Sequence, residues 1–373
     1  MTLRIAVVLR DFSFGGTERI AIRLANRWSA NRANVSVFAG REEGLLRSLL
    51  EDSVSLWLAT PRIGLGLGSA ARLGQAVRRR LIDEPVDVLF VPGNCHWPVA
   101  AAFRGIAKAQ RPIIVAQVSN ALRKPQRGRL RQHLFEARMR QRLKACDAVV
   151  TMAETDRILA NQILRRTDCI AIASPAVGAS TEPPLPIDPN SRLILAAGRL
   201  VKQKAFEVLI EAFAIVSRHD SEAQLLILGD GPERSILERQ IMALGLSERV
   251  QMPGYVEDIR PFLDRARMFV LSSRFEGYPA VIIEALSAGR PVVSTACTPA
   301  ANELLSAPSA GRVVPLEHPE ALALAILAEL QSPPPSPSTL ATLIEPYRID
   351  VVAANYEGLF RLLLMPRMQA LGG

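Results

Sequence analysis

The chain has 373 residues, of which 49% are hydrophobic and 22% are charged, a composition close to the average of folded soluble proteins. This excludes a disordered or collagen-like chain, and at roughly 100–200 residues per domain the length predicts two domains. No segment approaches the roughly 18 consecutive apolar residues of a membrane-spanning helix. The first residues, LRIAVVLRDF, are typical of a strand and not of a signal peptide. We therefore expect a cytoplasmic protein.

The net charge of +9 is distributed unequally along the chain. Residues 1–172 contain 28 Lys and Arg against 14 Asp and Glu, a net charge of +14, whereas the remainder carries −5. A basic surface favours anionic partners. Nucleic acid is not expected among them, because aromatic residues make up only 5% of the chain and no stacking platform alternates with the charges. The four cysteines are scattered without the paired spacing of a disulfide framework or a zinc site.

Short apolar segments alternate with amphipathic ones along nearly the whole chain. In the first half this pattern predicts strands at 5–9, 35–38, 86–91, 112–118 and 147–151, and in the second half at 192–198, 223–229, 267–273 and 290–295. Such alternation is typical of parallel sheets with right-handed crossovers. We expect an α/β architecture of two doubly wound, Rossmann-like domains facing a central cleft. Ligands should lie outside the carboxyl ends of the strands.

Proline marks the boundary between the two predicted domains. Residues 174–191 contain five prolines and can continue neither a helix nor a sheet, which predicts a linker. The predicted N-terminal domain is therefore 1–173 and the C-terminal domain 192–345. The remaining residues, 346–373, are expected to form a helix that packs back towards the N-terminal domain.

The loop RDFSFGGTER (10–19) follows the first strand and opens a helix. Gly15 and Gly16 allow close approach to the backbone, and the helix start offers free N–H groups, a geometry that suits a phosphate. An ordinary tight turn fits this loop equally well, and it is not a G-x-G-x-x-G dinucleotide fingerprint.

A second strand end leads into a helix at GRLVKQKAFEVLIEAF (198–213). Arg199 and Lys204 stand near the start of this helix, where the helix dipole disfavours cations. A bound diphosphate would resolve that conflict, although two solvated surface cations remain the alternative.

A third strand end, SSRFEGYPAVIIEALSAGRPVV (272–293), carries two glutamates. Glu276 lies in the loop and Glu284 on the following helix, and carboxylates are good acceptors for sugar hydroxyl groups. The intervening backbone could direct its N–H groups at phosphates; its residues are Gly277, Tyr278, Pro279, Ala280 and Val281. A solvent-facing helix glutamate is the alternative for Glu284.

In this order, with LLILGDGPER (225–234) and MPGYVEDI (252–259) between them, the motifs closely resemble the retaining nucleotide-sugar glycosyltransferases of the GT-B fold called family four. The resemblance covers almost the whole chain and is strongest from about 192 to 330. It implies that Gly15 and Gly16 take part in donor phosphate and acceptor binding. It further implies roles for six residues: Arg199 and Lys204 neutralise the diphosphate, Glu276 contacts the donor sugar, Glu284 holds the ribose, and Tyr255 and Val256 cradle the base.

Two of the departures from the family pattern concern the predicted site. Members commonly have Gly after the lysine, where Ala205 stands here; alanine is the better helix former, so we expect the change to be harmless. Many members also place a histidine at the end of the strand that here leads to Ser119 and Asn120. Asn120 and His96 are therefore the candidates on the acceptor side, with a loop histidine of no catalytic role as the alternative for His96.

The resemblance implies retaining transfer of a hexosyl group from a UDP- or GDP-linked sugar to a glycan acceptor in exopolysaccharide or lipopolysaccharide synthesis. Front-side attack is implied, with Arg199, Lys204 and Glu276 as the catalytic group and charge stabilisation as its main contribution. No metal or other cofactor is expected, because the sequence lacks an Asp-x-Asp triplet of the manganese-binding type. Two alternatives stay open: a nucleotide-sugar epimerase of the same two-domain fold, and a non-catalytic protein that binds sugar nucleotides.

A basic segment suggests where the acceptor is carried. Residues 123–144 contain nine basic residues and one acid, Glu136. Part of the segment reads as a helix whose apolar residues cluster towards one side; these are Leu130, Leu134, Phe135, Met139 and Leu143. A basic amphipathic helix predicts peripheral binding to an anionic membrane, here its inner face, and hence a lipid-linked acceptor. A solvated basic face on a core helix is the alternative.

Overall fold

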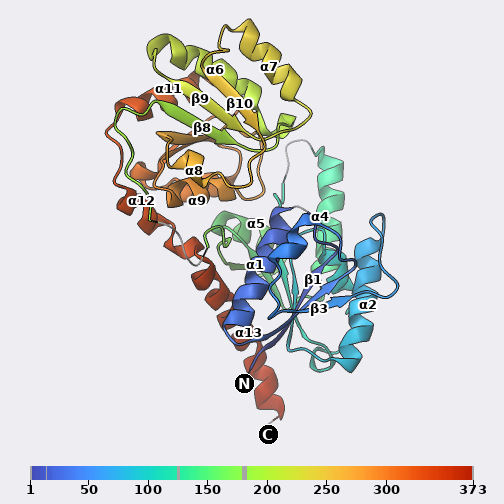
Figure 1. The fold of residues 1–373 in the computed structure, drawn as a ribbon. Coiled ribbons are helices and arrows are strands. Elements are labelled where there is room, and N and C mark those ends of the chain that lie inside the picture. The colour runs from blue at the N-terminus through green and yellow to red at the C-terminus, as the bar shows by residue number, and fades with distance from the viewer. Residues whose placement is uncertain (1, 14, 124–126, 179–182, 372–373) are drawn as a thin grey trace. The chain divides into compact units, whose positions relative to one another are not determined.

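The computed structural model describes residues 2–13, 15–123, 127–178 and 183–371. They form two compact units, each built around one sheet (Figure 1). The first unit takes the chain up to Pro175 and again from Arg348 onward, and the second is Ala176–Tyr347. Residues 176–191, for which the sequence predicts a linker, are therefore counted with the second unit, where Val177 and Ile187 are buried.

The first unit contains a seven-stranded sheet in the order β3-β2-β1-β4-β5-β6-β7. Its strands are β1 (Arg4–Leu9), β2 (Asn34–Ala39), β3 (Ser55–Leu58), β4 (Val88–Val91), β5 (Ile113–Gln117), β6 (Ala148–Thr151) and β7 (Ile170–Ala171). All the pairings between them are parallel. The predicted fold class is confirmed for this half.

Helices cover both faces of the first sheet. Alternate residues of a strand point to opposite faces, so neighbouring residues of β1 pack against different helices. Ile5 and Val7 of β1 pack with α1 (Gly16–Ala30) and α13 (Ile349–Leu371). Ala6 and Val8 face the other layer, which contains α2 (Ser69–Asp83), α3 (Trp97–Ala101), α4 (Arg129–Leu143) and α5 (Glu154–Leu164). Two short 3₁₀ helices, Leu45–Leu49 and Lys108–Gln110, lie in the connections.

The second unit repeats the scheme with a six-stranded parallel sheet in the order β10-β9-β8-β11-β12-β13. Its strands are β8 (Leu193–Ala197), β9 (Gln224–Leu228), β10 (Val250–Gly254), β11 (Met268–Leu271), β12 (Val292–Thr295) and β13 (Gly311–Val314). One face packs against α6 (Phe206–His219), α7 (Arg234–Ala243) and α11 (Pro319–Gln331). The other packs against α8 (Arg260–Leu263), α9 (Ala280–Ser287), α10 (Pro299–Leu304) and α12 (Pro337–Leu343). The 3₁₀ helices are Lys202–Lys204, Pro308–Ala310 and Glu345–Tyr347.

Four strands were not predicted from the sequence, and they are the four edges of the two sheets: β3, β7, β10 and β13. Each is partly exposed along its length. An edge strand is less covered than a central one, so its sequence does not show the continuous apolar run of a strand buried on both faces. The nine predicted strands are the central ones.

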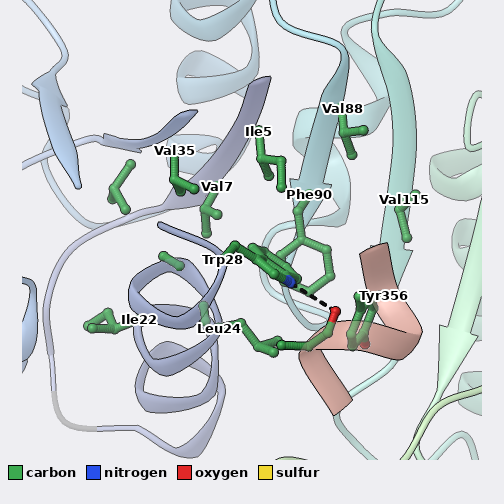
Figure 2. Close-up of a cluster of buried hydrophobic side chains, with 14 of the residues drawn as sticks. Ile5, Val7, Ile22, Leu24, Trp28, Val35, Val88, Phe90, Val115 and Tyr356 are labelled. Carbon is green, nitrogen blue, oxygen red and sulfur yellow. Dashed lines mark hydrogen bonds between the residues drawn. The ribbon is translucent and has the colours of Figure 1, made fainter. Parts of the chain in front are cut away.

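Helix α13 completes the core of the first unit (Figure 2). Trp28 of α1 lies edge-to-face against Phe90 and Tyr356, with ring centroids 5.3 and 5.8 Å apart, and its ring N–H donates to the carbonyl oxygen of Ala353 at 3.2 Å. The amide of Gln117 in β5 donates to the Tyr356 hydroxyl at 3.0 Å. Residues from the end of the chain are thus integral to this core.

Candidate functional site

Two loops at the carboxyl edge of the second sheet carry the predicted donor-binding residues. The first follows β8 and contains Gly198, Arg199 and Lys204; the second follows β11 and contains Glu276. Because β8 and β11 are neighbours in a parallel sheet, both loops leave the same edge side by side.

A polar network joins these two loops. The Lys204 ammonium group lies 2.7 Å from Oε1 of Glu276, and the Ser273 hydroxyl donates to the same oxygen at 2.7 Å. The loops are also tied through their backbones: the Ser272 hydroxyl donates to the Lys204 carbonyl at 2.8 Å, and the Arg274 N–H donates to the Gln203 carbonyl at 2.8 Å. The structure therefore brings Lys204 and Glu276 together, as a pair that the sequence did not predict.

The pair is largely shielded from water. The side chains of Lys204 and Glu276 are 20% and 11% exposed, so their attraction is weakened less by solvent than that of a surface pair. Cys297 adjoins them, because its carbonyl accepts the Glu276 N–H at 3.2 Å. Burial, together with the negative charge of Glu276, raises the pKa of the Cys297 thiol to about 11. The thiol thus adds no charge at neutral pH.

Arg199 has a different environment from Lys204. Its side chain is exposed and makes no hydrogen bond or ion pair with any residue that the structure describes. One positive charge at this edge is thus balanced by Glu276, and the other is available to an anionic ligand.

Close backbone contacts hold the first loop in place. A Cβ atom on Gly229, whose φ is +134°, would lie 2.0 Å from the carbonyl oxygen of Gly198. A Cβ on Gly231 would lie 2.4 Å from the Leu200 carbonyl oxygen. The loop after β9 can therefore pack against the loop after β8 only because glycine occupies these two positions.

Ala205 adopts the left-handed conformation, with φ +49° and ψ 42°, and precedes the first residue of α6. The expectation that alanine here is a harmless helix former is wrong, because the residue is not helical. A left-handed alanine costs roughly 1–2 kcal/mol. Glycine, which the resemblance leads one to expect, would avoid that steric cost.

The other predicted donor residues lie along the same edge. Gly277 and Tyr278 precede α9, Pro279 caps it, and Ala280 and Val281 open it. Glu284 lies further along α9 and is half-buried. Tyr255 and Val256 follow the edge strand β10; Tyr255 is 62% exposed. Val256 and Val281 pack on the same apolar cluster.

In the first unit, the glycine loop precedes α1. A Cβ on Gly15 would lie 2.3 Å from Oε2 of Glu18, whereas Gly16 has open space around it. Burial raises the pKa of Glu18, and a hydrogen bond to its own backbone N–H opposes this rise. The N-terminus of α1, where the sequence predicts a phosphate, therefore already holds a carboxylate beside Gly15.

Ser119 links the end of β5 to two neighbouring loops. Its hydroxyl accepts from the Thr17 hydroxyl at 3.0 Å, and its N–H donates to the side-chain oxygen of Asn94 at 3.0 Å. Thr17 and Asn94 were not singled out in the sequence, although both follow predicted strand ends. Asn120 is exposed and makes no side-chain contact within the described part of the chain.

The structure corrects the acceptor-side prediction for His96. The ring is fully buried; its Nδ1–H donates to the Pro92 carbonyl at 2.6 Å, and Nε2 accepts the Arg10 N–H at 3.2 Å. Burial lowers the pKa of His96 to about 4. His96 joins the ends of β1 and β4 as a neutral structural residue and has no free nitrogen for an acceptor.

The basic segment forms α4, with Lys124 outside the described residues. Arg131, Arg138 and Arg142 are spaced by seven and four residues and therefore lie on one face of the helix. They line a groove of about 350 Å³ together with Trp97 and Phe135. We call these three arginines the α4 arginine stripe. None of them has an acidic partner within the described ranges.

The apolar side predicted for this helix is only partly present. Met139 and Leu143 are buried, but Leu130 and Leu134 are 74% and 50% exposed. The five apolar residues therefore do not share one environment, because the leucines of the first turns are exposed and the residues near the end of the helix are buried.

Comparisons with known proteins identify both halves. Residues 14–167 match the family described as Glycosyltransferase Family 4, and residues 191–332 match Glycosyl transferases group 1. A stretch of 106 residues is 42% identical to the lipopolysaccharide core biosynthesis glycosyltransferase LpsE of Rhizobium meliloti, covering 28% of this chain and 30% of that protein.

Another stretch, of 129 residues, is 32% identical to the N-acetylgalactosamine-N,N'-diacetylbacillosaminyl-diphospho-undecaprenol 4-alpha-N-acetylgalactosaminyltransferase of Campylobacter jejuni, covering 35% of this chain and 34% of that protein. The alignments span less than half the length of the curated relatives that the chain matches.

The fold matches over nearly the whole length. The crystal structure of Anabaena Alr3699/HepE in complex with UDP and glucose has a TM-score of 0.76 at 20% identity, covering 96% of this chain and 99% of that one. The fold is therefore that of the GT-B glycosyltransferases. Among the described residues, no helix is long and apolar enough to span a bilayer, and no three His, Cys, Asp or Glu side chains converge as metal ligands would.

We predict that Gly229→Ala destabilises the second unit by about 2 kcal/mol or more, because the new methyl group overlaps the Gly198 carbonyl and overpacking costs typically 1–3 kcal/mol. Scanning calorimetry should show a lowered transition. Gly358→Ala is the control, since a Cβ there meets nothing within 4 Å. An unchanged thermogram for Gly229→Ala would contradict the close-contact account.

We also predict that the stability of the first unit falls as pH drops from about 6.5 towards 4. The unfolded chain binds a proton at His96 in this range and the folded chain does not, because the folded pKa is about 4. The loss should reach about 3 kcal/mol at the acid end.

Tryptophan fluorescence can follow this unit alone, because Trp28, Trp57 and Trp97 all belong to it. His96→Asn should flatten the pH dependence of urea unfolding. Parallel curves for the two proteins would show that His96 does not titrate as described.

Proposed function

We propose that this chain, which belongs to the glycosyltransferases of family 4 and group 1, transfers a hexosyl group from a UDP- or GDP-linked sugar to a glycan acceptor with retention of anomeric configuration. The observation that carries the proposal is the carboxyl edge of the second sheet, where Arg199, Lys204 and Glu276 converge on two adjacent loops. Hydroxyl and diphosphate groups are the chemistry that this set of charges fits.

In the proposed reaction, charge develops on the departing diphosphate. Arg199 is free to pair with it, and Lys204 can share its ammonium group between Glu276 and a phosphate oxygen. The N–H groups at the start of α9 add a partial positive charge. Such preorganised groups stabilise the transition state without a metal ion, which is how we propose that the enzyme works.

Glu276 and Glu284 are assigned different parts of the donor. Glu276 is fixed by Lys204 and Ser273, and we place the donor sugar against its second carboxylate oxygen. Glu284 lies about one turn after the first residue of α9, where we place the ribose. Tyr255 and Val256, in the loop after β10, are assigned the base.

The acceptor side is assigned to the first unit, with Gly16, Ser119 and Asn120 near strand ends. We propose a lipid-linked acceptor and a role in lipopolysaccharide or exopolysaccharide synthesis. The names of the Rhizobium and Campylobacter relatives support this, since they refer to lipopolysaccharide core and to diphospho-undecaprenol. The α4 arginine stripe supports it physically, because three unpaired arginines favour an anionic membrane surface.

The function is tested by measuring nucleoside diphosphate release from UDP- and GDP-sugars with and without a lipid-linked oligosaccharide. Acceptor-dependent release with a retained anomeric configuration, read by NMR of the product, is the expected result. Interconversion of the donor sugar without acceptor would instead indicate an epimerase. Tight binding without turnover would indicate a non-catalytic sugar-nucleotide protein.

Arg199→Ala and Lys204→Ala should each lower turnover about 10²–10³-fold, the loss seen when one donor to a developing oxyanion is removed. Lys202→Ala is the matched control, because its exposed side chain lies in the same loop outside the Lys204–Glu276 network. Near-normal turnover of both variants at saturating donor would refute the assignment.

Replacing the α4 arginine stripe by Gln should release the protein from anionic liposomes and leave donor binding unchanged. Each basic residue near an anionic surface contributes about 1 kcal/mol, so three suffice for a clear shift in sedimentation. Replacing Arg72, Arg79 and Arg104 by Gln removes the same charge from exposed positions elsewhere in the unit. Equal release by both triple variants, or equal sedimentation with neutral vesicles, would show that α4 is only a solvated basic face.

A further inference from the structure

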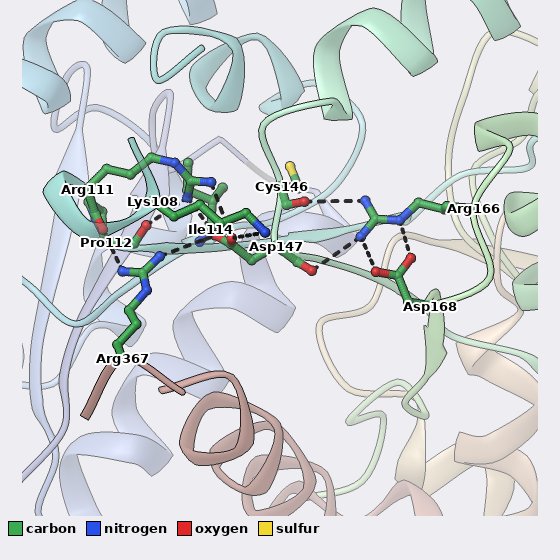
Figure 3. A network of polar contacts seen from close by, with 9 residues as sticks. All are labelled: Lys108, Arg111, Pro112, Ile114, Cys146, Asp147, Arg166, Asp168 and Arg367. Carbon is green, nitrogen blue, oxygen red and sulfur yellow. Dashed lines mark hydrogen bonds and ion pairs between the residues drawn. The ribbon is translucent and has the colours of Figure 1, made fainter. Parts of the chain in front are cut away.

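A second concentration of positive charge lies at the opposite end of the first sheet from the strand-end loops. A cavity of about 440 Å³ opens there between the ends of α4 and α5 and the segments that precede β5 and β6. Its charged lining residues are Lys108, Arg111, Arg140, Lys144, Arg166 and Asp168. We call it the amino-edge pocket; its surroundings are drawn in Figure 3.

The carboxylates around the pocket are already paired with cations. Asp147, whose side chain is 8% exposed, receives two bonds from Arg111, at 2.6 and 3.2 Å. The same carboxylate is also the nearest acid to Lys108 and to Arg367 of α13, each at 3.9 Å. Asp168 is paired with Arg166 at 2.5 Å. One carboxylate thus serves three cations.

Several cations therefore remain without a counter-charge of their own. Arg140 donates only to the Ile163 carbonyl, and Lys144 is exposed without a partner in the described segments. Arg367 has a buried nitrogen, Nη2, that makes no hydrogen bond to the residues the structure describes, and burial together with the positive charge of Arg111 lowers the pKa of Arg367.

Neither the thiol nor the helix ends can compensate. Burial raises the pKa of Cys146 to about 12, so the thiol is neutral. The carboxyl ends of α4 and α5 each supply roughly half a negative elementary charge. The charges around the pocket do not cancel. Its six cations leave an excess of four positive charges over the carboxylates of Asp147 and Asp168; the cations are Lys108, Arg111, Arg140, Lys144, Arg166 and Arg367. The two helix ends reduce this excess by only about one.

We propose that the amino-edge pocket binds a phosphate-bearing ligand, with Lys108, Arg140 and Lys144 as the residues that contact the phosphate. A phosphate supplies up to two negative charges and accepts several hydrogen bonds at once, which matches cations that lack acceptors. The cavity falls within the usual range of small-molecule sites, about 300–1,000 Å³, and so has room for the rest of a phosphorylated molecule. This site is separate from the proposed donor site, which belongs to the second unit, and does not depend on the proposed function.

The test uses the full chain with inorganic phosphate and inorganic diphosphate as probes and hydrogen–deuterium exchange read by mass spectrometry. Binding at the amino-edge pocket should slow exchange in peptides covering 104–112 and 140–147. Binding at the proposed donor site would instead slow exchange in peptides covering 198–206 and 272–284. Peptide location therefore separates the two sites.

Lys108→Gln with Lys144→Gln is the test variant, because both side chains are exposed and neither is needed for the Arg111–Asp147 pair. Its affinity for the probes at the pocket should be weaker by at least about tenfold, the loss expected from one or two charged hydrogen bonds. Arg72→Gln with Arg79→Gln removes the same charge from exposed positions on α2, outside both the pocket and the α4 arginine stripe, and should leave the protection in place.

Two further arms identify the source of the phosphate. Vesicles with phosphatidic acid, compared with neutral phosphatidylcholine vesicles, report a lipid headgroup, and the soluble probes report a free ligand. Protection of the pocket peptides by either source, lost in the test variant only, supports the site. Absence of protection, protection that survives in the test variant, or equal loss in the control variant would overturn it.

Discussion

The ion pair between Lys204 and Glu276 connects the two loops on which the proposed chemistry of the second unit depends. The loops follow adjacent strands, and the pair fixes the ammonium group of one against the carboxylate of the other at 2.7 Å. Because both groups are mostly shielded, removing either would leave the other as a poorly solvated charge, which is more costly than losing a surface pair. The position of the Lys204 side chain therefore depends on Glu276 as much as on the backbone of its own loop. Arg199, which lacks such a partner, has only the backbone of its loop to position it.

The backbone of that loop is in turn held by contacts from the neighbouring strand end. Gly229 and Gly231 allow the loop after β9 to reach the carbonyls of Gly198 and Leu200. Ala205 keeps a left-handed conformation at the start of α6, which places Lys204 in the 3₁₀ turn Lys202–Lys204 instead of in the helix. The backbone conformation thus sets the position of the Lys204 Cα atom, and the ion pair with Glu276 sets the position of the Lys204 ammonium group.

Much of this architecture follows from the sequence because central strands and strand-end loops carry strong local signals. The buried strands show continuous apolar runs, and Arg199, Lys204 and Glu276 follow them directly. The edge strands do not show such runs, because each of them is partly exposed to solvent. The pairing of Lys204 with Glu276 depends on β11 lying beside β8, and strand order is a property of the whole sheet that local periodicity does not contain.

The errors have the same origin. His96 was taken as a candidate for the acceptor side because it follows a strand, but the ring is buried and both of its nitrogens are used in hydrogen bonds to the backbone of Arg10 and Pro92. Ala205 was judged by its helix propensity, yet its conformation is set by the chain around it.

The return of the chain to the first unit constrains the order in which the protein can fold during synthesis. Trp28 donates to Ala353, 325 residues later, and the core around it needs Tyr356 and Phe360 as well. A ribosome adding about 5–20 residues per second thus exposes the apolar face of α1 for some tens of seconds before its partner emerges. The second unit, whose residues are contiguous, has no such wait. The first unit therefore begins to emerge from the ribosome first but is completed last. During that interval the apolar face of α1 is a surface that a chaperone can bind.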